Sequence, residues 1–182
     1  AASILRAKLG HARGTVVDIG CGSGLLCEIL AEAGHDLVGV DQSDAMLELA
    51  GARAPSARLF NASIVDYRPP PASAICAIGE VLCYDAGAGA AWRHLDTIVS
   101  RWFAALRPGG VVLLDVATPG RITTPIERFV TEGDWAIWYR GEEDHHARSL
   151  TREMVTYRKV GGGYRRGGET HRLELASPER VE

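Results

Sequence analysis

Residues 16–24 read VVDIGCGSG, and this stretch decides the fold of the chain. The apolar run over residues 15–19 predicts a buried strand, and apolar residues at helical spacing from Leu25 predict a helix that ends at Gly34. Between them the glycines are spaced Gly-x-Gly-x-Gly, which lets the backbone turn sharply and approach a ligand closely. Strand, glycine loop and helix form the first half of a βαβ unit.

Strands and helices are predicted to alternate on both sides of this unit. Ser43 is expected to cap a helix, and residues 92–106 form a long apolar helix that Arg107-Pro108-Gly109-Gly110 stops. A further helix is expected over residues 3–9. The remaining apolar runs predict strands over residues 36–40, 57–60, 74–78 and 111–116. Such alternation favours a parallel sheet.

The pattern changes beyond Pro119. Residues 134–139, 152–160 and 164–175 alternate as half-exposed antiparallel strands do, and Gly161-Gly162-Gly163 predicts a hairpin between the last two. Ser177-Pro178-Glu179 is typical of a helix start, with Ser177 as its cap. We expect this helix to be truncated at the end of the sequence.

Composition limits the class of partner. The 182 residues are 46% hydrophobic, enough for one sizeable core, and the formal charge of −3 does not favour binding to nucleic acid. No apolar stretch is long enough for a signal peptide or a membrane span. The cysteines form no Cys-x-x-Cys pair, so we expect reduced, mostly buried thiols. The chain is therefore predicted to be cytoplasmic and to act on small molecules.

The glycine loop also carries information about its ligand. A dinucleotide loop of the Gly-x-Gly-x-x-Gly type needs a glycine where Leu25 stands. Asp18, just before the first glycine, would repel a phosphate and attract a cationic amino-acid group. Both features favour a sulfonium amino-acid cofactor over NAD. The alternatives for the loop are a glycine turn that only allows close helix packing and a loop that binds another nucleotide. The alternative for Asp18 is a turn or capping residue.

These residues resemble the class I S-adenosylmethionine-dependent methyltransferases, whose glycine motif matches Asp18, Gly20, Gly22 and Gly24. The resemblance extends to Val38-Gly39-Val40-Asp41 and to Leu106-Arg107-Pro108-Gly109-Gly110, and covers most of residues 15–116. It implies a Rossmann-like, doubly wound α/β fold whose sheet runs 3-2-1-4-5-7-6 in complete relatives. We expect this chain to hold the first five strands and a C-terminal antiparallel β insert.

The resemblance also implies the cofactor contacts. Asp41 is suited to the ribose diol, and Gln42 or Met46 packs on the adenine. Where many relatives have Gly-Asp, this chain has Ala62-Ser63, so Ser63 inherits the contact with the adenine amino group. Gly79 and Glu80 follow the fourth strand, where the methionine portion binds. The predicted cofactor-binding residues are Asp18, Gly20, Cys21, Gly22, Gly24, Asp41, Gln42, Met46, Ala62, Ser63, Gly79 and Glu80. The side chains of Cys21 and Cys27 are expected to be small buried groups that pack in the loop and the helix.

The same plan divides the chain into three parts. Residues 1–118 are expected to form the cofactor-binding core, residues 119–176 an insert of the same domain on the substrate side, and residues 177–182 the start of the truncated helix. The aromatic side chains of Trp135, Trp138 and Tyr139 could line a substrate pocket or pack the insert.

No residue is marked as catalytic by the sequence alone. The candidates for a general base are Glu80, Tyr84, Asp85, His145, His146 and His171 with Glu169. Each has a structural alternative, since His145 and His146 sit in a hydrophilic turn, and Glu169 and His171 alternate on a strand where they can pair with arginines. No metal-ligand spacing is evident, so no metal is expected.

The predicted function is transfer of a methyl group from S-adenosylmethionine to a nitrogen or oxygen of a small molecule by in-line displacement. Two alternatives stay open: a non-catalytic S-adenosylmethionine-binding regulatory domain, and an NAD-dependent oxidoreductase. There is no Asp/Asn-Pro-Pro-Tyr segment or Pro-Cys pair, which argues against enzymes that methylate bases or glutamine. The acceptor and the oligomeric state are left open.

Overall fold

The computed structural model describes residues 1–9, 13–85 and 89–180. They fall into two compact units, Ala1–Leu82 with Ala91–Val116, and Cys83–Ala90 with Ala117–Glu182. Among the described residues, no helix has the length and apolar character that a membrane crossing requires.

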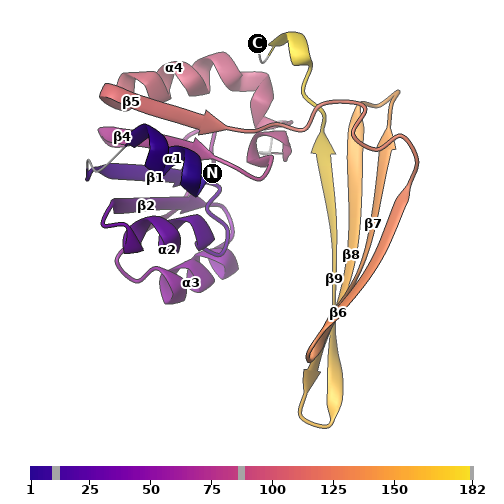
Figure 1. The fold of residues 1–182 in the computed structure, drawn as a ribbon. Helices are drawn as coiled ribbons and strands as arrows, with labels where there is room; N and C mark the ends of the chain where they lie inside the picture. The colour runs from indigo at the N-terminus through magenta and orange to yellow at the C-terminus, as the bar shows by residue number, and fades with distance from the viewer. Residues whose placement is uncertain (10–12, 86–88, 181–182) are drawn as a thin grey trace. The chain divides into compact units, whose positions relative to one another are not determined.

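The first unit is built on a five-stranded parallel sheet in the order β3-β2-β1-β4-β5 (Figure 1). This confirms the predicted Rossmann-like fold and strand order. Its strands are β1 (Thr15–Ile19), β2 (Asp36–Asp41), β3 (Arg58–Asn61), β4 (Ala72–Ala77) and β5 (Leu106–Leu114). Its helices are α1 (Ala2–Leu9), α2 (Leu25–Glu32), α3 (Asp44–Arg53) and α4 (Leu95–Ala105), with 3-10 turns at Val81–Cys83 and Ala91–His94.

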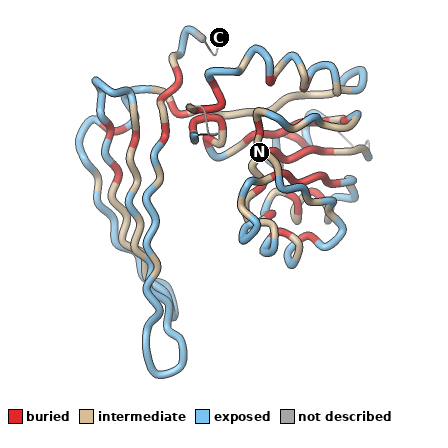
Figure 2. The backbone as a smooth tube through the Cα atoms, turned by 180° about the vertical axis from the view of Figure 1, so that it is seen from behind, coloured by how far each residue is buried: buried red, intermediate tan, exposed pale blue. Residues whose placement is uncertain are grey.

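The core of this unit lies on the central strands, as the buried segments of Figure 2 show. Val16, Val17 and Ile75 are almost fully buried, which suits strands covered on both faces. Helix α4 buries Ile98 and Trp102, but Phe103, expected in the same apolar stripe, is 61% exposed. Ser43 caps α3 as predicted, because its hydroxyl accepts from the Met46 N–H.

The expected start of the last parallel strand was wrong. We predicted a strand over residues 111–116 after a Pro-Gly stop, whereas β5 begins at Leu106 and ends at Leu114. Pairing with β4 jumps from Ala72↔Leu106 to Ala74↔Val111, so the Arg-Pro-Gly-Gly segment forms an irregularity within the strand. The helix does end before this segment, at Ala105.

The second unit is a four-stranded antiparallel sheet in the order β6-β7-β8-β9. Its strands are β6 (Ile126–Glu132), β7 (Trp135–Asp144), β8 (Ser149–Val160) and β9 (Gly163–Glu174). The hairpin at Gly161 is confirmed, and β6 was not predicted. β7 extends past the predicted residue 139 to Asp144, so the expected hydrophilic turn is shorter than predicted. At the C-terminus Pro178–Arg180 forms a 3-10 turn, and residues 181 and 182 lie outside the described part.

Candidate cofactor site and methyltransferase family

The glycine loop is held against the second strand by backbone hydrogen bonds. The N–H groups of Gly20 and Cys21 donate to the Val40 carbonyl at 2.7 and 3.0 Å. Gly20 and Gly24 have φ values of +70° and +78°, a left-handed conformation that favours glycine. Gly24 also has no room for a side chain, since a Cβ there would lie 2.9 Å from the Ala50 backbone of α3. The loop therefore needs glycine for both backbone conformation and helix packing.

Asp41 joins the loop to the start of α3. One carboxylate oxygen accepts from the Gly22 N–H and the other from the Ser43 N–H, each at 2.9 Å. These bonds fix the carboxylate at the carboxyl end of β2, and each oxygen keeps a second lone pair for a ligand hydroxyl.

Asp18 is a buried carboxylate at the end of β1, with 4% of its surface exposed. The Cys27 thiol donates to it at 3.7 Å. Burial raises its pKa to about 7, the thiol hydrogen bond opposes that shift, and the negative charge of Asp41 adds to it. A cationic ligand group beside Asp18 would offset the electrostatic cost of ionising this buried carboxyl group.

A cavity of about 530 Å³ opens beside these residues. Asp18 gives it a negative group, and aliphatic side chains from α2 give it an apolar wall. Its lining comprises Ala1, Ala2, Ser3, Asp18, Gly20, Cys21, Ser23, Leu25, Leu26, Ile29, Ile78 and Gly79. The size and the apolar lining with few polar groups suit a small-molecule site.

The other predicted cofactor residues lie at the same edge of the sheet, after the ends of β2, β3 and β4. Gln42 and Met46 are exposed at the start of α3. Ala62 and Ser63 follow β3, and the Ser63 hydroxyl accepts from the Val65 N–H at 3.2 Å. Gly79 lines the cavity, whereas Glu80 is buried and has φ +61°.

The second unit brings Tyr84 to two candidates that are distant from it in the sequence, Glu169 and His171. The Tyr84 hydroxyl lies 3.2 Å from His171 Nδ1, and His171 Nε2 lies 3.1 Å from Glu169 Oε2. The two rings meet edge to face at 5.6 Å. Because an ionised carboxylate only accepts, the His171 proton belongs on Nε2, which leaves Nδ1 to accept from Tyr84. This contact is fixed by a backbone bridge between Tyr84 and Leu173.

A family model described as a methyltransferase domain matches residues 16–110, the segment that contains the glycine loop, Asp41 and most of the cavity wall. The chain belongs to this methyltransferase domain family. The match covers β1 to the middle of β5 and so includes most of the parallel sheet.

Curated relatives of this methyltransferase domain include a trans-aconitate 2-methyltransferase of Delftia acidovorans, 40% identical over 117 residues, or 62% of this chain and 41% of the relative. A ubiquinone biosynthesis O-methyltransferase of Mesorhizobium japonicum is 29% identical over 151 residues, 81% of this chain and 57% of the relative. The chain thus spans about half the length of these relatives.

Solved structures share the fold of the methyltransferase domain and its antiparallel insert. Streptomyces venezuelae DesVI superposes with a TM-score of 0.81 at 21% identity, covering 98% of this chain and 76% of that one. CalS10, an amino pentose methyltransferase from Micromonospora echinaspora, gives a TM-score of 0.78 at 22% identity, covering 99% and 76%. The fold predicted from the glycine motif is thereby confirmed.

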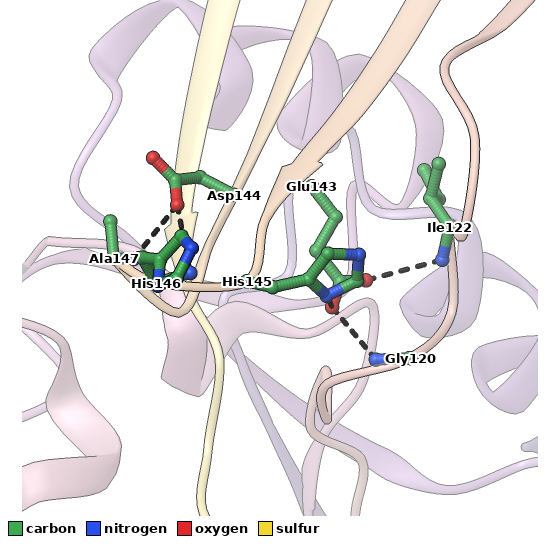
Figure 3. A network of polar contacts seen from close by, with 7 residues as sticks. All are labelled: Gly120, Ile122, Glu143, Asp144, His145, His146 and Ala147. Carbon is green, nitrogen blue, oxygen red and sulfur yellow. Dashed lines mark hydrogen bonds and ion pairs between the residues drawn. The ribbon is translucent and has the colours of Figure 1, made fainter.

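The histidine candidates of the methyltransferase insert lie in a polar network around Glu143 (Figure 3). The fully buried Glu143 side chain accepts from the N–H groups of Gly120 and Ile122 at 2.7 and 3.1 Å, and His145 Nδ1 lies 3.0 Å away. Burial opposes ionisation of Glu143, but these backbone hydrogen bonds and His145 outweigh it and lower the pKa. The His146 backbone N–H donates to Asp144. Both histidines thus take part in holding a turn.

This network predicts a stability effect. Glu143→Ala leaves the N–H groups of Gly120 and Ile122 without their acceptor, and we expect a loss of about 2 kcal/mol in the free energy of unfolding, measured in urea. Because the pKa is lowered, the contribution is full above the usual carboxyl range and is lost as the pH falls through it. Glu142→Ala, an exposed neighbour paired with Arg140, is the control and should cost under about 0.5 kcal/mol. Equal costs for both variants would contradict the prediction.

Predictions from the sequence also concerned the cysteines and the metal-ligating residue types. The four cysteines are free and buried, as predicted. Within the described residues, no group of three or more acidic, histidine or cysteine side chains is placed to hold a metal ion. The sequence prediction did not include Asp115, although it lies near the carboxyl end of an apolar run, as Asp18 and Asp41 do, and this signal could have found it.

Proposed function

We propose that this chain binds S-adenosylmethionine and belongs to an enzyme that transfers its methyl group to a nitrogen or oxygen of a small molecule. The observation that carries the proposal is Asp18, a buried carboxylate that lines the cavity beside the glycine loop. A cationic amino-acid group is the ligand that such a site selects, and a diphosphate is the ligand that it repels.

The proposed cofactor contacts run along one edge of the sheet. The backbone of two loops, at Gly20, Cys21, Gly22, Gly24, Gly79 and Glu80, would face the cofactor, with its N–H groups already bonded within the protein. Asp41 would offer carboxylate lone pairs to the ribose. Gln42, Met46, Ala62 and Ser63 would surround the adenine. Residues 1–118 would then form the cofactor-binding core, and residues 119–176 the insert on the substrate side.

When bound, S-adenosylmethionine supplies an electrophilic methyl group for in-line displacement, so the protein must align the acceptor and exclude water. An acceptor hydroxyl or ammonium must also lose a proton. Tyr84 can take this proton at its hydroxyl oxygen while its own proton passes to His171 Nδ1. Glu169 would stabilise the resulting imidazolium.

The proposed class of methyl acceptor is suggested by the compounds in the names of the relatives and structural neighbours. We propose a carboxylic acid, a phenol or an amino sugar as acceptor, with no nucleic-acid, membrane or metal partner. The buried free thiols support a reducing compartment, the cytoplasm.

Calorimetric titration with S-adenosylmethionine, S-adenosylhomocysteine and NAD tests this function. Binding of the first two without NAD supports the proposal, and binding of NAD alone would replace it with the oxidoreductase alternative. A panel of carboxylic acids including trans-aconitate, phenols and amino sugars then separates an enzyme from a cofactor-binding regulatory domain. Methyl transfer to none of these compounds would favour the regulatory domain.

The raised pKa of Asp18 predicts a pH dependence of binding. With its pKa at about 7, Asp18 is protonated below neutral pH, and binding of a cationic cofactor must then release that proton. We expect the affinity for S-adenosylmethionine to fall roughly 20-fold from pH 7.5 to pH 5.5, by calorimetry. Asp18→Asn should bind weakly at both pH values and lose this dependence. An unchanged dependence in the variant would assign it to another group.

A further inference from the structure

The turn that follows β4 has an unusual backbone. Gly79 and Glu80 both adopt left-handed conformations, with φ values of +89° and +61°. Glycine accepts this conformation freely, but a residue with a Cβ is strained by about 1 kcal/mol or more. Glu80 is also buried, with 7% of its surface exposed. Such a turn needs support from the surrounding structure.

Asp115, at the carboxyl end of β5, supplies this support. Its Oδ2 accepts from the Gly79 N–H at 3.2 Å and its Oδ1 from the Glu80 N–H at 2.6 Å. The Asp115 backbone is itself fixed, because its N–H donates to the Ala77 carbonyl at 3.1 Å. Consecutive N–H groups that converge on one anion form a nest. Here the nest is filled by a carboxylate of the protein.

The same turn forms part of the cofactor cavity. Ile78 and Gly79 lie in its wall, together with Asp18 and Gly20. Val81, the next residue after the turn, packs on the glycine loop so closely that a Cβ on Gly20 would lie 2.2 Å from its side chain. A shift of the turn would therefore move both the cavity wall and a residue that supports the loop.

We infer that Asp115 is a positioning residue for the cofactor: it fills the nest at Gly79 and Glu80, holds the strained turn, and withholds these N–H groups from phosphate ligands. This inference rests on the proposed cofactor binding. Asp115 acts through the turn, so the affinities for S-adenosylmethionine and for S-adenosylhomocysteine depend on it alike. A carboxylate that acted only on the sulfonium charge would affect S-adenosylmethionine alone.

A double-mutant cycle between Asp115 and Glu80 tests the inference. We expect Asp115→Ala to raise the Kd of both ligands about 10-fold to 100-fold, since small displacements of a binding wall are costly. In the Glu80→Gly background the turn is no longer strained, and the same substitution should cost less than about threefold. Asp115→Asn, which keeps one acceptor oxygen, should fall between the wild type and Asp115→Ala.

Asp36→Ala is the matched control, because Asp36 is an exposed aspartate at the amino end of β2, the opposite edge of the sheet. Its Kd values should stay within about twofold of the wild type. Additive effects of Asp115→Ala and Glu80→Gly, or wild-type affinity in a folded Asp115→Ala protein, would overturn the inference. If Asp115→Ala does not fold, Asp115→Asn takes its place in the cycle.

Amide hydrogen exchange separates this inference from the proposed function. If the wild type binds neither ligand, the function proposal fails, but the support of the turn is still tested. Faster exchange at Gly79 and Glu80 in Asp115→Asn, with unchanged exchange at Val38 in the core of β2, supports the inference. Unchanged exchange at both turn residues overturns it.

Discussion

Replacing Gly20 by alanine is expected to abolish measurable cofactor binding and to lower the free energy of unfolding by about 3 kcal/mol. Two costs combine at this position. The φ of +70° strains any residue with a Cβ, and that atom would lie 2.2 Å from the Val81 side chain. Val81 is β-branched and has few rotamers with which to escape. The turn after β4 or the loop itself must therefore shift, and both line the cavity.

Gly22→Ala separates these two costs. Gly22 has φ +51°, but a Cβ added there would meet nothing within 4 Å, so only the conformational cost of about 1 kcal/mol applies. Gly162→Ala in the β8–β9 turn, with neither constraint, should leave stability unchanged within about 0.5 kcal/mol. Urea unfolding and calorimetry with S-adenosylhomocysteine measure both effects. If Gly20→Ala is no less stable than Gly22→Ala, the Val81 side chain can move away from the added Cβ without a measurable cost in stability.

The parallel sheet could be predicted because its signals are local. The apolar run that forms β1 ends at a glycine loop, and its predicted bounds match Thr15–Ile19. Asp41 was predicted at the end of β2, and its carboxylate does lie beside the loop, bound to the Gly22 N–H. Strand, turn and helix cap are each set by neighbouring residues, so the sequence pattern is sufficient.

Features that depend on distant residues escaped prediction. Strand β6 was missed because six of its seven residues are exposed, and a strand without a buried face shows little apolar alternation. The start of β5 depends on an irregular pairing with β4 that no local pattern records. The contact between Tyr84 and His171 depends on the register by which Tyr84 meets β9 at Leu173. Each residue was a candidate by type, but only the fold brings them together.

The second large effect is expected at Tyr84, with the acceptor that the panel identifies. Tyr84→Phe removes the hydroxyl that contacts His171 Nδ1 and should lower kcat about 100-fold, the usual contribution of a positioned acid or base. The ring is retained, so the edge-to-face contact with His171 and the fold should persist. The Kd of S-adenosylmethionine and the KM of the acceptor should change little, because the Tyr84 hydroxyl acts on the proton only during its transfer in the transition state.

Substitutions of His171 and Glu169 are expected to lower kcat by different amounts, because His171 contacts Tyr84 directly and Glu169 contacts His171. His171→Ala should lower kcat almost as much as Tyr84→Phe, because the Tyr84 phenol then has no acceptor for its proton. Glu169→Gln should have a smaller effect, since a glutamine oxygen can still accept from Nε2 but cannot balance an imidazolium charge. Glu153→Gln, an exposed glutamate on β8, is the control and should leave kcat unchanged. A purely structural role for the Tyr84–His171 contact would instead lower stability in all three variants and leave kcat of the folded protein intact.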